Sequence, residues 1–144
     1  MRRTLLLGGL GLSGVLTGAC GEETPERAIY AIAHDLEHDG YAGACQRLYP
    51  GSRLPPAVRR ALDFEQGPSW APGDASCQRA FESGSLADFT LVEPRVRSVS
   101  TRSIRESGAV TAVATAQVAI DGERPVSVRL VELDGRWRVV PSSG

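Results

Sequence analysis

The chain has 144 residues with 16 arginines, no lysine and 17 acidic residues, so its formal net charge is −1 at pH 7. This length allows one small domain with a modest core and is too short for two. The near balance of charge argues against nucleic acid as a partner.

The first 19 residues have the three parts of a secretory signal peptide. Two arginines follow the first methionine, an uncharged run extends from 4 to 15, and the small residues Gly18 and Ala19 precede a cleavage site. The run is shorter than the roughly 20 apolar residues of a membrane-spanning helix. The sequence therefore predicts export, either by the general secretory route or, through the arginine pair, by the twin-arginine route.

Cys20 directly follows this segment. The residues Leu-Thr-Gly-Ala-Cys at 16–20 resemble the lipobox of bacterial lipoproteins, in which the cysteine thiol takes a diacylglyceryl group and becomes the mature N-terminus. Two or more acyl chains give a stable anchor, whereas one binds only marginally. We expect a lipoprotein held by Cys20 on the extracytoplasmic face of the cell membrane, with residues 20–24 as a short tether. Simple secretion after cleavage at Ala19 is the alternative.

The assignment of Cys20 to lipid leaves Cys45 and Cys77 as an even pair. In an oxidising compartment such a pair predicts a disulfide. The disulfide would close a loop of about 33 residues and contribute about 3.7 kcal/mol to stability on the chain-entropy formula. The alternative, a reactive or metal-binding thiol pair, lacks the short spacing and nearby histidines of such sites.

Helical patterns fill the first half of the remaining chain. Thr24-Pro25-Glu26 supplies an N-cap, a proline suited to the first helical position and an early acid, and Asp39-Gly40 marks the end of this helix. Its apolar stripe follows helical spacing: Ile29, Ile32, Ala33 and Leu36. Three shorter helices are expected to begin near Tyr41, Pro55 and Asp74, with Asp74 as a cap.

From residue 91 the apolar period changes to two. A first strand is expected over 95–105, and the inward face of the second alternates: Val110, Ala112, Ala114, Ala116, Val118 and Ile120. Asp121-Gly122 and Asp134-Gly135 are hairpin signals that lead to two further strands. Helices followed by an antiparallel meander predict an α+β fold in which the N-terminal helices cover one face of a sheet.

The order of these features is similar to that of a known family. The first helix, Gly-Tyr-Ala-Gly-Ala-Cys-Gln-Arg-Leu at 40–48, a second cysteine about 30 residues later, and Asp-Gly-Arg-Trp-Arg-Val at 134–139 resemble small actinobacterial lipoproteins with a nuclear transport factor 2-like, cystatin-like domain. The resemblance covers residues 25–141. It implies a cone in which a curved antiparallel sheet wraps the first helix and leaves a pocket at its open end.

No residue pattern predicts a cofactor, a metal site or a catalytic group. His34 and His38 are four residues apart and are the pair that could chelate a metal. They lie about 140° to 180° from the centre of the apolar stripe, on the solvent side of their helix, which argues against a buried metal site. The inward positions of the second strand carry no ionisable group, and the opposite face offers Thr111, Thr115 and Gln117, which do not titrate usefully.

Aromatic residues are the candidates for contact with a ligand or partner. Trp70 lies in the Gly/Pro-rich loop 67–73, where it forms a wall for an apolar ligand or folds down onto the core. The alternation of the last strand places Trp137 in the core or in a pocket lining. Tyr30 and Tyr41 belong to the mouth of the cone or to the edge of the core.

Three functions remain open because members of such a superfamily include binding modules, assembly partners and enzymes. The first is a membrane-anchored binding or regulatory module for a small apolar molecule or an envelope protein. The second is a structural interaction domain with a filled cone. The third, an isomerase-like or dehydratase-like enzyme, needs an inward acid or base that the strand pattern lacks.

The lipid anchor is directly testable. Replacement of the thiol in Cys20→Ser should abolish incorporation of radiolabelled palmitate into the protein, because the diacylglyceryl group attaches through that sulfur. Cys45→Ser is the control and should keep the label. Labelling retained in Cys20→Ser would overturn the anchor.

Overall fold

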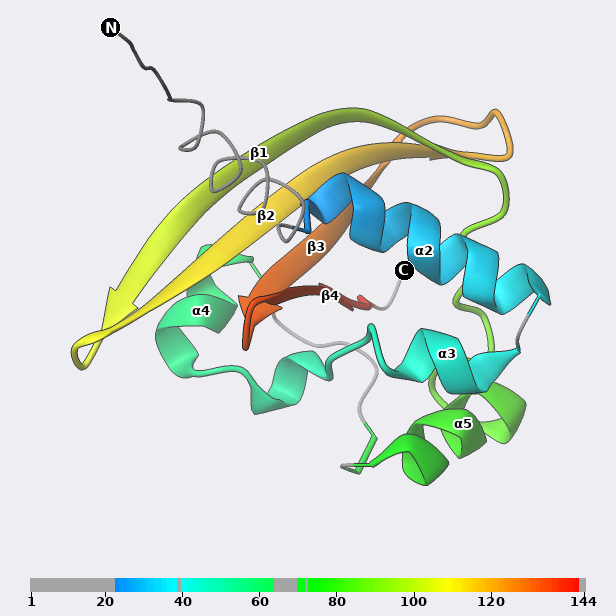
Figure 1. Cartoon of the computed structure of the whole chain (residues 1–144), viewed down its shortest axis with the longest axis horizontal. Coiled ribbons are helices and arrows are strands. Elements are labelled where there is room, and N and C mark those ends of the chain that lie inside the picture. Colours follow the sequence, from blue (N-terminus) through cyan, green and yellow to red (C-terminus); the bar gives the residue numbers. More distant parts are fainter. Residues whose placement is uncertain (1–22, 39, 64–69, 72, 143–144) are drawn as a thin grey trace, which may run out of the picture.

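The computed structural model describes residues 23–38, 40–63, 70–71 and 73–142, which form an α+β fold (Figure 1). The predicted signal peptide, Cys20, and most of the loop before Trp70 lie outside these residues. Five helical elements come first: α2 (Pro25–His38), α3 (Tyr41–Cys45), η1 (Gly51–Arg53), α4 (Pro56–Ala61) and α5 (Asp74–Ser83). One antiparallel sheet follows with its strands in sequence order: β1 (Pro94–Glu106), β2 (Ala109–Ile120), β3 (Val126–Leu133) and β4 (Arg136–Val140). No helix within these residues is long and apolar enough to cross a bilayer.

Helix α2 begins as the sequence predicts. The Thr24 hydroxyl accepts a hydrogen bond from the backbone N–H of Arg27 at 3.2 Å, and Pro25 occupies the first helical position, where no backbone donor is needed. Ile29 and Ile32 of the predicted stripe are fully buried, and Ala28 is buried beside them. The cap therefore sets where the helix starts, and the stripe sets which side faces the sheet.

Two-residue turns close the hairpins at both ends of the meander. Ser107-Gly108 and Asp134-Gly135 have positive φ at both positions, which is the type I′ geometry that matches strand twist. A register shift between Val96 and Ser98 bends β1 against β2. At this bulge the N–H of Val96 donates to the Tyr30 hydroxyl of α2 at 3.0 Å. The curvature of the sheet and the position of α2 are thus connected.

The main core lies between α2, α3 and α5 and the concave face of the sheet (Figure 1). Helix α2 packs against the sheet, α3 against α2, and α5 against α3. The sheet contributes small and β-branched residues near α2 and one large aromatic, Trp137, which is almost fully buried. Of the two predicted places for Trp137, the core or a pocket lining, the structure shows the core.

A second core lies on the opposite face of the sheet, beneath α4. Leu130 packs in the main core, whereas its neighbour Val131 packs with Leu54 and Val58, because successive strand residues point to opposite faces. Arg129, on the same face as Val131, donates from its guanidinium to the carbonyl of Leu62 at the end of α4. The prediction that the helices cover only one face is therefore wrong.

The start of β2 departs from the predicted inward face. Val110 pairs with Arg105 near the tip of the β1–β2 hairpin and is 57% exposed. The tip extends beyond the helices in Figure 1, so no helix covers it. The predicted inward face holds for Ala114, Ala116 and Val118, which are buried in the main core, and for Ala112 and Ile120, which are partly buried against it.

The free edge of β4 is covered by the chain after α3. Leu48 forms a parallel bridge with Val139, the N–H of Tyr49 donates to the Val139 carbonyl at 3.0 Å, and the N–H of Val139 donates to the Arg47 carbonyl at 2.8 Å. This short pairing satisfies backbone groups that an edge strand otherwise leaves open.

The predicted disulfide between Cys45 and Cys77 is present, with an S–S distance of 2.03 Å and Cα atoms 5.9 Å apart. It joins α3 to α5, and both cysteines are buried. The N-cap position of α5 is Gly73, and Asp74 is the first helical residue, so the prediction of Asp74 as a cap is corrected by one position. An acid in the first turn still suits the helix dipole.

Removal of the disulfide should destabilise the domain strongly. The double variant Cys45→Ala/Cys77→Ala is expected to lose about 3 to 4 kcal/mol of unfolding free energy, because the open chain regains the entropy of a long loop. Urea unfolding of the full chain in nonionic detergent measures this loss. Reduced wild type should behave like the double variant, whereas Cys20→Ser should match oxidised wild type. A loss below about 1 kcal/mol would contradict the structural role.

Candidate functional site

A groove of about 620 Å³ opens at one end of the sheet. Three parts of the chain line it: the segment after α5, the ends of β2 and β3 around their turn, and the end of β4. The lining residues are Ser85, Asp88, Phe89, Thr90, Leu91, Ile120, Val126, Ser127, Val128, Val139, Val140, Pro141 and Ser142. The volume lies within the range of small-molecule sites, roughly 300 to 1,000 Å³.

The wall formed by residues 84–92 is held at both ends. At its start, the N–H groups of Gly84 and Leu86 both donate to the Ala80 carbonyl at 3.0 Å, and the Leu86 side chain is fully buried. At its far end, the carbonyl of Val92 accepts a hydrogen bond from the N–H of Asp121 at 2.9 Å. The wall is therefore fastened to α5 and to the end of β2, which favours a groove that exists before any ligand binds.

The groove is apolar at its floor and polar at its rim. Leu91, Val128 and Val139 are buried, whereas Val126 is 46% exposed beside them. Asp88 is the only ionisable side chain among the described lining residues, and its side chain is exposed. General acid–base chemistry usually requires two groups of different protonation. This arrangement is suited to binding an apolar molecule.

A smaller groove of about 410 Å³ lies beside the first, between α2 and residues 90–94. Thr90 and Leu91 belong to both linings, so this short segment divides the two. His34 borders the smaller groove, and its side chain is 66% exposed. The ring of His34 lies 4.5 Å from that of His38, which is also exposed, as the helical geometry predicts. Within the described residues, no group of three metal-ligating side chains lies close together.

The four aromatic residues that the sequence nominates for ligand contact lie in separate places outside the larger groove. Trp137 is in the core and Trp70 is partly buried against it. Tyr41 stacks on Phe81 with ring centroids 4.5 Å apart, and the Tyr30 hydroxyl bonds to the bulge in β1. Each of the four thus has a contact within the domain, a hydrogen bond for Tyr30 and packing for the other three, and their contact with a ligand stays a prediction.

Sequence reasoning missed the wall of the groove. Leu86, Phe89 and Leu91 follow the end of α5 with neither helical nor strand periodicity. The signal that could have revealed the wall is the presence of apolar side chains in an irregular segment, because these side chains must pack against the domain or line a binding surface. Their partners on β2, β3 and β4 are distant in sequence and become neighbours only through the sheet.

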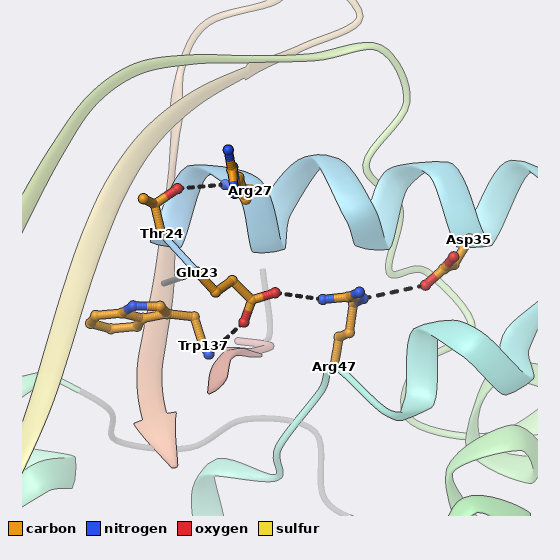
Figure 2. Close-up of polar contacts among 6 residues, drawn as sticks. All are labelled: Glu23, Thr24, Arg27, Asp35, Arg47 and Trp137. Atoms are coloured by element: carbon orange, nitrogen blue, oxygen red, sulfur yellow. Dashed lines mark hydrogen bonds and ion pairs between the residues drawn. The ribbon is translucent and has the colours of Figure 1, made fainter. Parts of the chain in front are cut away.

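A polar clamp joins the start of the domain to β4 (Figure 2). The Glu23 carboxylate accepts from Arg47 Nη1 at 2.7 Å and from the backbone N–H of Trp137 at 3.0 Å. Arg47 Nε lies 3.5 Å from Asp35 Oδ2. A Cβ at Gly43 would lie 3.0 Å from Asp35 Cγ, so the glycine leaves room for this carboxylate. We call Glu23, Arg47 and Asp35 the polar clamp.

The polar clamp is partly shielded from water. The side chains of Glu23, Arg47 and Asp35 are 22%, 30% and 19% exposed, respectively. Charge-assisted hydrogen bonds at such sites are stronger than those at the open surface. The clamp therefore fixes the chain only three residues after Cys20.

No family model, curated protein sequence or solved structure matches this chain.

The coupling within the polar clamp is measurable by a double-mutant cycle. Glu23→Gln and Arg47→Met should show a coupling of about 1 kcal/mol in unfolding free energy, because each single change removes the same ion pair. High salt should reduce the coupling. The control cycle combines Arg47→Met with Glu26→Gln, an exposed acid on α2, and should give no coupling. Equal coupling in both cycles would contradict a specific clamp.

Proposed function

We propose that this protein is a lipid-anchored, extracytoplasmic binding module whose larger groove takes a small apolar molecule. The groove carries the proposal: about 620 Å³ of concave surface with an apolar floor and few polar groups, which is the usual character of a small-molecule site. The fastened wall of residues 84–92 supports binding without a large ordering cost.

The anchor is the second part of the proposal. Cys20 precedes Glu23 by three residues, so an extended chain between them spans at most about 10 Å. The polar clamp holds Glu23 at Trp137, near the start of β4, whereas the groove is lined by the end of β4. Attachment at Cys20 would keep the domain close to the membrane while the groove lies toward the other end of that strand.

The fold supports a kinship that we also propose. A sheet curved over a long first helix agrees with the cone of a nuclear transport factor 2-like domain, and the groove at one end of the sheet agrees with the pocket at the open end of that cone. Helix α4 on the opposite face is an addition to the cone that the resemblance implies. The superfamily has no single activity, so binding in the groove is argued from the site itself.

A photoreactive apolar probe tests binding in the groove. An uncharged alkyl diazirine should label the full chain, in nonionic detergent, on the tryptic peptide 80–95, which carries the fastened wall. Val126→Asp should reduce this labelling about tenfold, because a charge at the groove lowers the affinity for an apolar chain.

Val110→Asp is the matched control. It places the same charge at a similarly exposed valine of the same sheet, at the hairpin tip outside the groove, and should label like wild type. Circular dichroism checks that both variants fold. Absence of label on 80–95 in wild type, or equal loss in both variants, would overturn groove binding in favour of a purely structural domain.

A further inference from the structure

Among the described residues that line the groove, one carries a charged side chain, and that side chain is an acid. Asp88 is exposed at the rim, and no ion pair engages its carboxylate within the described residues. Four further exposed acids, Glu82, Glu93, Asp121 and Glu123, and two arginines, Arg95 and Arg124, flank the lining segments in sequence without belonging to the lining. No arginine or histidine is among the described lining residues.

The arginine that follows the lining residues of β3 is directed to the other face of the sheet. Arg129 follows the lining residue Val128, but it belongs to the other face of the sheet, where its guanidinium bonds to the Leu62 carbonyl. Within the described residues, neither an ion pair nor a cation of the lining therefore neutralises the Asp88 carboxylate. A field of one sign at the mouth raises the local concentration of ligands with the opposite charge.

We propose that the groove takes amphiphiles whose apolar chain ends in a positively charged amine and that it discriminates against alkanoates. This inference rests on the proposed function, since it assumes that an apolar chain enters the groove. The chain lies on the floor made by Leu91, Val128 and Val139, and the ammonium group stays at the rim beside Asp88. There it keeps part of its hydration while it gains an opposite charge.

The preference follows from the exposure of Asp88. An exposed ion pair contributes modestly, and a carboxylate head group replaces that attraction by repulsion of similar size. Together these effects predict about a fivefold to tenfold preference for the amine over the carboxylate of equal chain length. An uncharged alcohol should fall between them.

Three photoreactive probes with one common alkyl diazirine chain test the proposal: a primary amine, an alcohol and a carboxylate. Each is photolysed at pH 7 with the full chain in nonionic detergent, and labelling of the tryptic peptide 80–95 is quantified. The readout is the ratio of amine to carboxylate labelling. Because the ratio is taken within each variant, differences in the reactivity of the target side chains cancel.

Two variants locate the origin of the ratio. Asp88→Asn should lower it at least threefold, toward one. Asp63→Asn makes the same change of charge after α4, at a residue with φ of 54°, a conformation that asparagine also adopts, and should keep the wild-type ratio. Asp63 is not part of the groove lining.

The outcomes separate this inference from the proposed function. Strong labelling of 80–95 by all three probes with a ratio near one would overturn the amine preference and leave groove binding intact. A high ratio that Asp88→Asn leaves unchanged would also overturn it. Failure of every probe to label 80–95 in wild type would overturn groove binding, and the amine preference with it.

Discussion

The packing of α2 against the concave face of the sheet is the interaction on which the rest of the structure depends. Ile29 and Ile32 are fully buried there, and the Tyr30 hydroxyl meets the β1 bulge at the place where the sheet bends. Helix α3 packs against α2, and the Cys45–Cys77 disulfide bonds α5 to α3. Short helices have little stability of their own, so their position depends on burial and on the covalent bond.

The groove is a consequence of this arrangement. Residues that follow α5 cross to the end of β2, where the Val92–Asp121 hydrogen bond fastens them, and they form a wall against the ends of β3 and β4. Buried residues, Leu91, Val128 and Val139, supply an apolar floor, while the Asp88 side chain stays exposed at the rim. Such a division favours recognition of an amphiphile over acid–base chemistry, because the charge is at the entrance.

Local features were predictable because their causes are local. The Thr24 cap, the two-residue turn at Asp134-Gly135 and the Cys45–Cys77 pairing depend on residue type, on spacing and on the parity of cysteines. The placement of α4 was not predictable in this way. Val58 of α4 and Leu62 directly after it pack with Val113 and Val131. The sequence does not reveal this second buried face, because the same strands already have one apolar face.

By itself, the sequence determined the α+β order, the start of α2, the disulfide and the burial of Trp137, since each follows from short-range chemistry or from a simple period. Only the tertiary structure decided that both faces of the sheet are covered, that Glu23 hydrogen-bonds to Arg47 and Trp137, and that the irregular segment after α5 forms one wall of a groove. The physical reason is that these contacts join residues from distant parts of the chain. Their geometry is set by the curvature and register of the whole sheet, which no local pattern encodes.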